Sequence, residues 1–120
     1  MGRRVKSVYL CGDIAGDPGY FEKYLSAEEV MRLYGYTVLS PALLPLELGV
    51  GAFVRIASAM LDECDAVCLL PDWVVSKSAA VEHDRARLLG KRVFRFEKWE
   101  RHFGAMEVLG DEGSLRRVSV

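Results

Sequence analysis

Apolar positions along the chain follow two alternating patterns. Short, nearly continuous apolar runs have the length of buried strands, at residues 5–11, 36–40, 66–70 and 92–96. Between them lie longer segments whose apolar residues recur every three or four positions, at residues 20–35, 52–64 and 76–90. This spacing places side chains on one face of a helix. The pattern therefore predicts strands that alternate with helices.

Such alternation predicts a parallel sheet, because parallel strands need crossover connections and helices usually supply them. We expect an α/β fold: a Rossmann-like or flavodoxin-like doubly wound parallel sheet of four to five strands in three α/β/α layers. The 120 residues, 51% of them hydrophobic, suit one domain over residues 1–120 with its core in residues 5–96. Residues 97–120 have the spacing of a helix, and residues 114–120 are a strand, a tail or a subunit contact.

Each predicted helix has an apolar face, and one of these faces contains an acidic residue. In residues 20–35, Phe21, Leu25 and Leu33 recur at helical spacing. In residues 76–90 the inward stripe is interrupted by an acid, since it reads Ala79, Glu82, Ala86 and Leu89. A buried carboxylate must be paired, hydrogen-bonded or protonated. Glu82 is therefore either a functional group or the partner of a nearby basic residue such as Arg85 or Arg87.

Charge and composition exclude several classes of protein. The 16 Lys and Arg against 17 Asp and Glu leave a net charge of −1, which gives no overall field for a nucleic acid polymer or an anionic membrane. No apolar run approaches the roughly 20 residues that span a bilayer, and the start of the chain is too short in apolar residues for a signal peptide. We expect a cytoplasmic protein with a small-molecule partner.

The cysteines give no sign of a disulfide framework or a zinc site. There are three, Cys11, Cys64 and Cys68, with no C-x-x-C spacing, and both histidines lie far from them in sequence. We therefore expect no metal and no cofactor. A second reading makes Cys11 a thiolate nucleophile with His83 as its base, and otherwise His83 faces solvent or caps a neighbouring loop.

Ligands of open α/β sheets bind beyond the carboxyl ends of the strands, where the strand order reverses. Residues 12–19, 39–45 and 71–78 follow predicted strands and meet this condition. Ser76 and Ser78 begin a helix, whose free N–H groups favour an anion such as phosphate. The first loop lacks the Lys-Ser/Thr ending of a phosphate-binding loop and the spacing of a dinucleotide fingerprint. Kinases, ATPases and dehydrogenases are therefore disfavoured.

Three segments resemble a known family in order and spacing: VYLCGDIAG, CDAVCLLPDW and SKSAAVEHDRARLLGKRV. They are similar to the nucleoside 2-deoxyribosyltransferase-like superfamily, most closely to its branch of small bacterial and phage domains. The resemblance covers residues 5–96. Its characterised members are deoxyribosyltransferases and deoxynucleoside 5′-monophosphate N-hydrolases. It implies cleavage or transfer of an N-glycosidic bond on a nucleoside 5′-monophosphate or nucleoside.

The resemblance also implies residue roles. Glu82 matches the glutamate nucleophile that attacks C1′ and forms a glycosyl-enzyme, and such a carboxylate near a helix N-terminus is expected to stay ionised. Tyr9 matches a tyrosine that orients the nucleophile, and Ser76 matches the serine of the nucleotide hydrolases, which favours a monophosphate. The implied substrate-binding set also includes Gly12, Asp13, Ile14, Gly16, Asp72, Ser78 and Ala79.

Some positions depart from the family pattern. Ala57 stands where the characterised enzymes hold the sugar with an aspartate, and Ser78 and Asp72 each replace a glycine. Asp72 would supply an acidic contact or act as general acid, and Asp13 would meet a base or a sugar hydroxyl. The alternative function is a non-catalytic nucleotide-binding or sensing module. A phosphoacceptor receiver domain is disfavoured, because Asp13 and Asp72 imitate its acidic residues poorly.

The family resemblance also implies an assembly. Relatives commonly form dimers or larger oligomers in which a neighbour completes the site. Apolar residues outside the predicted core offer such a contact, namely Trp73, Val74, Trp99 and Phe103. We therefore expect a homodimer or higher homo-oligomer.

Overall fold

The sheet consists of four parallel strands. The structure, a computed structural model, describes residues 4–99. Its strands lie in the order β2-β1-β3-β4. They are β1 Ser7–Cys11, β2 Thr37–Leu39, β3 Ala66–Leu69 and β4 Arg92–Arg95. The α/β prediction is confirmed, whereas the predictions for residues 100–120 lie outside the described residues.

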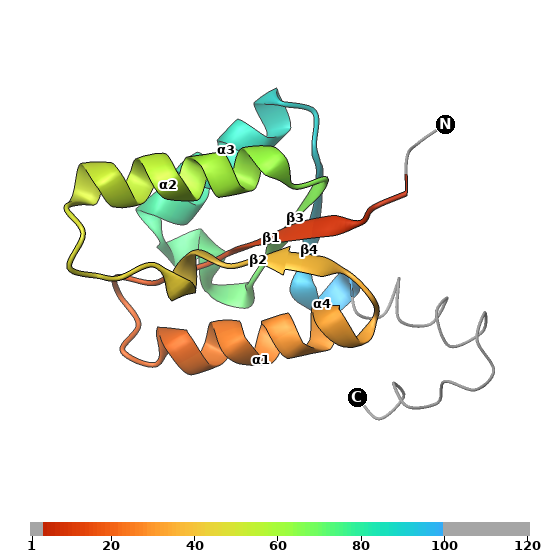
Figure 1. Cartoon of the computed structure of the whole chain (residues 1–120), viewed down its shortest axis with the longest axis horizontal. Coiled ribbons are helices and arrows are strands. Elements are labelled where there is room, and N and C mark those ends of the chain that lie inside the picture. The colour runs from red at the N-terminus through yellow and green to blue at the C-terminus, as the bar shows by residue number, and fades with distance from the viewer. Residues whose placement is uncertain (1–3, 100–120) are drawn as a thin grey trace.

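Helices cover both faces of this sheet. The elements between the strands are α1 Tyr20–Leu33, the 3-10 turn η1 Pro41–Leu43, α2 Val50–Glu63, the 3-10 turn η2 Pro71–Val75 and α3 Lys77–Leu88; α4 Phe96–Trp99 follows β4. Figure 1 shows α1 on one side of the strands and α2 with α3 on the other. The fold is therefore doubly wound, with three α/β/α layers, as the alternating pattern predicts.

Successive residues of β1 point into two separate cores. Val8 and Leu10 belong to the cluster beneath α1, whereas Tyr9 and Cys11 belong to the cluster beneath α2 and α3. All four side chains are fully buried. This follows from the period of two along a strand, combined with apolar layers on both faces. Tyr9 is thereby directed toward α3.

The inward face of α1 differs from the predicted one. Phe21, Leu25 and Leu33 are 45%, 41% and 68% exposed, so the face they share is not the buried one. The buried face consists of Tyr24, Ala27, Glu28 and Met31. Both sets have helical spacing, and contact with β1 selects the second because small Ala27 lets the helix approach while Tyr24 and Met31 fill the space beside it.

The face of α3 follows the sequence pattern for most of its length. Ala79 and Ala86 are fully buried and bring the helix close to the sheet, while Glu82 between them is partly buried. Leu89 was predicted to lie on the same stripe, but it is half exposed because α3 ends at Leu88 and the chain turns away. Gly90 makes this turn with a φ of +73°, which favours glycine.

The strand order places β1 and β3 side by side at the middle of the sheet. Cys11 is in register with Leu69, so both strands end at the same level. The chain moves outward from this pair in opposite directions, to β2 on one side and to β4 on the other. The loops that follow β1 and β3 therefore meet at the switch point, where ligands of this fold class bind.

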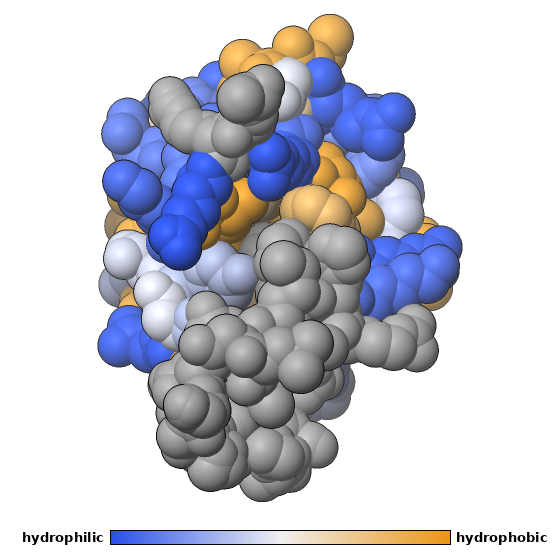
Figure 2. Space-filling view, turned by 90° about the vertical axis from the view of Figure 1, so that its right-hand side faces the viewer, coloured by the Kyte–Doolittle hydropathy of each residue, from blue (hydrophilic) through white to orange (hydrophobic). Residues whose placement is uncertain are grey.

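The right-hand side of Figure 1 faces the viewer in Figure 2. Hydrophilic residues cover much of the described surface there and surround smaller apolar groups. No helix within residues 4–99 is long and apolar enough to cross a membrane.

Candidate functional site at the carboxyl edge of the sheet

Glu82 meets Tyr9 between α3 and the sheet. The Tyr9 hydroxyl donates a hydrogen bond to Glu82 Oε2 at 2.8 Å. β1 supplies the tyrosine from its buried face, and α3 brings the glutamate one turn below its own N-terminus. The resemblance implied this pair, and the structure brings its two members into contact.

The surroundings of Glu82 act on its ionisation in opposite directions. Burial raises the pKa of the carboxyl, while the Tyr9 hydrogen bond and the neighbouring Cys11 thiol lower it, and the pKa is raised overall. The sequence suggested a carboxylate kept ionised by the helix N-terminus. The structure adds a desolvation cost to that picture, and the two groups offset part of it because they favour the charged form.

The alternative reading, in which Glu82 is the partner of Arg85, is wrong. The Arg85 guanidinium donates to both carboxylate oxygens of Asp62, at 2.8 Å and 2.7 Å, and thereby ties α3 to α2. Arg85 also lowers the pKa of Asp62. The guanidinium thus makes its bidentate contact with α2, on the side of α3 that faces away from the sheet. Glu82 lies on the inner side, toward Tyr9.

Cys11 does not have the surroundings of a thiolate nucleophile. Its thiol is fully buried and donates to the Ala79 carbonyl at 3.4 Å. Burial, followed by the nearby Glu82 charge, raises the pKa of the thiol. A nucleophilic thiolate needs the opposite shift. The proposed base is engaged as well, because the ring of His83 stacks on Trp73 with centroids 4.7 Å apart. His83 is thus partly exposed, with its ring against Trp73 of η2 and its Nδ1 3.2 Å from Asp84 Oδ1.

The loop after β1 packs tightly against the loop after β3. A Cβ on Gly12 would lie 3.0 Å from both Asp72 Oδ1 and Leu70 Cβ, closer than nearly all real contacts of this kind. The Asp13 N–H donates to Asp72 Oδ1 at 3.2 Å, and the Asp13 carboxylate accepts from the Gly16 N–H at 3.1 Å. Gly12 therefore allows the close approach that joins the two loops.

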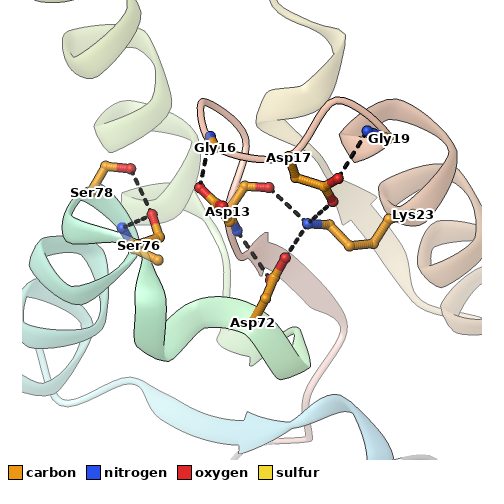
Figure 3. A network of polar contacts seen from close by, with 9 residues as sticks. Asp13, Gly16, Asp17, Gly19, Lys23, Asp72, Ser76 and Ser78 are labelled. Atoms are coloured by element: carbon orange, nitrogen blue, oxygen red, sulfur yellow. Dashed lines mark hydrogen bonds and ion pairs between the residues drawn. The ribbon is translucent and has the colours of Figure 1, made fainter.

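Lys23 is the residue of this region that the sequence analysis missed. Its ammonium, from the first turn and a half of α1, donates to the Asp13 carbonyl and to Asp17 Oδ2, both at 2.8 Å, and forms an ion pair with Asp72. Figure 3 shows these three acceptors around Nζ. The available signal was a lysine in the first turn of a helix that follows a loop with two aspartates.

Asp72 is consequently engaged on both oxygens, one by Lys23 and one by the Asp13 N–H. Both oxygens of this carboxylate therefore already have partners within the protein. The structure therefore offers no support for Asp72 as a general acid. It gives Asp72 a connecting role between the two loops.

Ser76 caps the start of α3, and Ser78 lies beside it. Ser76 Oγ accepts from the Ala79 N–H at 3.1 Å and lies 3.2 Å from Ser78 Oγ. Ser76 is 6% exposed, whereas Ser78 is exposed. This is ordinary N-cap geometry. In Figure 3 the Asp13 side chain projects toward the serines and its carbonyl toward Lys23, so the loop lies between the two.

The remaining predicted residues have different surroundings. Ile14 is partly buried against the core beneath α1, and Ala79 is fully buried with its backbone bonded to Ser76 and Cys11. Ala57, at the position of the expected sugar-holding aspartate, is 2% exposed on α2. Among residues 4–99, no three His, Cys, Asp or Glu side chains are grouped as metal ligands.

The fold and the residues at the carboxyl edge of the sheet define the class of protein. It is a doubly wound parallel α/β protein with a hydrogen-bonded Tyr–Glu pair beside the switch point. Residues 6–95 match the model of a domain of unknown function, DUF4406. The chain therefore belongs to that family. No curated protein matches the chain.

Proposed function

We propose that the protein cleaves or transfers the N-glycosidic bond of a nucleoside 5′-monophosphate or nucleoside through Glu82, as in the nucleoside 2-deoxyribosyltransferase-like superfamily. The observation that carries this proposal is the Tyr9 to Glu82 hydrogen bond of 2.8 Å. A glutamate retained in an apolar helix face costs stability through desolvation, so its orientation by a buried tyrosine favours a chemical role.

The reaction balances with the groups at hand. A Glu82 oxygen attacks C1′ of the sugar, the C1′–N bond breaks, and its electron pair leaves with the base, which takes a proton from water. Water or a second base then attacks C1′, loses a proton to the solvent, and releases Glu82 as a carboxylate. Tyr9 acts as a positioning residue, because its hydroxyl holds the carboxylate that must attack in line.

The direct test is base release. The purified protein is incubated with a panel of ribo- and deoxyribonucleosides and their 5′-monophosphates, and free base is measured by chromatography. Glu82→Gln keeps an acceptor for Tyr9 but removes the nucleophile, and Glu29→Gln on the exposed face of α1 is the matched control. We expect release by the unaltered protein and by the control variant, with a loss of at least about a thousandfold in Glu82→Gln.

A covalent intermediate gives a second readout. A 2-fluoro-2-deoxyribosyl nucleoside slows hydrolysis of a glycosyl-enzyme, so the intact mass should increase by one sugar residue on the peptide that contains Glu82. Base release that persists in Glu82→Gln, or an adduct on another peptide, would refute the assignment of the nucleophile.

A non-catalytic nucleotide-binding or sensing module is the second candidate. Ala57 favours it, since a buried methyl group stands where the resemblance expects an acid to hold the sugar. This reading predicts a thermal shift with one of the same compounds but no base release. Restoration of the acid by Ala57→Asp would then test whether the missing contact is the cause.

A further inference from the structure

One ammonium connects the three segments that surround the switch point. Lys23 Nζ contacts the Asp13 carbonyl and Asp17 Oδ2 in the loop after β1, and it pairs with Asp72 in η2 after β3. Lys23 itself belongs to α1. A contact with Asp17 alone would only stabilise the start of α1, whereas the pair with Asp72 spans 49 positions of sequence and joins separate loops.

The backbone of the loop after β1 also lies close to Asp72. Asp72 Oδ1 accepts from the Asp13 N–H, and a Cβ on Gly12 would crowd the same oxygen at 3.0 Å. Residues 12 and 13 continue directly from Cys11, whose thiol donates to the Ala79 carbonyl on α3, the helix that carries Glu82. The loops held by Lys23 are thus the loops beside Glu82.

The contact between the two loops depends on the positive charge of Lys23. Asp17 and Asp72 are 32% and 29% exposed at their side chains and share the ammonium, which is 23% exposed. Ion pairs with this partial burial are screened less than those on an open surface. Without the ammonium, carboxylates of the two loops would face each other unpaired and would repel.

We infer that Lys23 is a positioning residue: its ammonium holds the loop after β1 and the loop after β3 together beside Glu82, in the arrangement that receives the ligand. The kinetic part of this inference rests on the proposed function. The Lys23 ammonium is held by Asp13, Asp17 and Asp72 rather than by Glu82. It acts by preorganisation, since loops already held in place cost less conformational entropy when a ligand binds.

Hydrogen exchange tests the inference without any assay of activity. In Lys23→Met we expect amides in residues 12–19 and 71–76 to exchange about tenfold faster, with the amides of β1 and β3 unchanged, because only the local opening becomes easier. Lys23→Arg keeps the charge and should restore most of the protection. Lys6→Met, on an exposed lysine outside this contact, is the control. Unchanged exchange in both loops would overturn the inference.

Kinetics separate positioning from a purely structural role. Lys23→Met should raise KM about tenfold and change kcat by less than about twofold, because the loops bind ligand whereas Glu82 stays in place on α3. Faster loop exchange with an unchanged KM would overturn the positioning role. Absence of base release by the unaltered protein would instead refute the proposed function, and the exchange comparison would still decide whether Lys23 holds the loops.

Discussion

The Tyr9 hydroxyl in β1 and Glu82 Oε2 in α3 are 2.8 Å apart, although the residues are 73 positions apart in sequence. A strand interior and a helix interior supply the two groups, so both are held by packed elements. A site on such elements keeps its geometry better than one on loops.

Tyr9→Phe removes the hydrogen bond and keeps the ring that fills the core. We expect base release to fall about tenfold to a hundredfold, because the carboxylate loses its orientation. The acid limb of the pH–rate profile should move to higher pH, since the Tyr9 bond lowers the pKa of Glu82. Tyr20→Phe removes a hydroxyl from α1 and should change neither. An unmoved acid limb in Tyr9→Phe would contradict the role of this bond.

Glu82→Gln should stabilise the fold at neutral pH. Burial raises the pKa of Glu82, so above the ordinary carboxyl pKa of 4.5 the unfolded chain ionises more easily and the stability of the unaltered protein falls. The variant lacks this cost. We expect it to be about 1 kcal/mol more stable at pH 7 by chemical denaturation, with the difference narrowing toward pH 4. Equal or lower stability of the variant at pH 7 would argue against the desolvation cost.

Gly12→Ala should disturb the contact between the loops after β1 and β3. The new methyl group would lie 3.0 Å from Leu70 Cβ and from Asp72 Oδ1. Such overpacking costs about 1 to 3 kcal/mol, which denaturant titration detects. Gly49→Ala is the matched control, because nothing lies within 4 Å of its Cβ and its φ of −63° suits alanine. Equal stability of the two variants would show that the loops adjust freely.

Arg85→Ala separates the outer face of α3 from its inner face. The variant loses both hydrogen bonds to Asp62 and so weakens the contact between α2 and α3. We expect a lower midpoint of thermal unfolding but an unchanged pH–rate profile for base release, because Glu82 bonds to Tyr9 rather than to Arg85. A shift of the acid limb in this variant would restore the ion pair between Glu82 and Arg85 as an explanation.

The family resemblance pointed to Tyr9 and Glu82, but not to every residue near them. The resemblance depends on short sequence motifs, and these motifs contain the two residues that meet between β1 and α3. Lys23 lies outside them, and its three acceptors come from positions 13, 17 and 72. Periodicity says nothing of such a contact, since it depends on how far α1 lies from η2. For the same reason the sequence could not indicate that both oxygens of Asp72 have partners, namely Lys23 and the Asp13 N–H.

The amino-acid sequence by itself determined the order and type of the elements, because burial on both faces of a parallel sheet demands apolar strands and amphipathic helices. Tertiary structure decided which helical face was buried. Phe21, Leu25 and Leu33 satisfied the helical spacing of α1, yet Tyr24, Ala27 and Met31 pack against the sheet. It also decided the partners of each charge, since ion pairs form between side chains that the fold brings close, and distance along the chain does not predict that closeness.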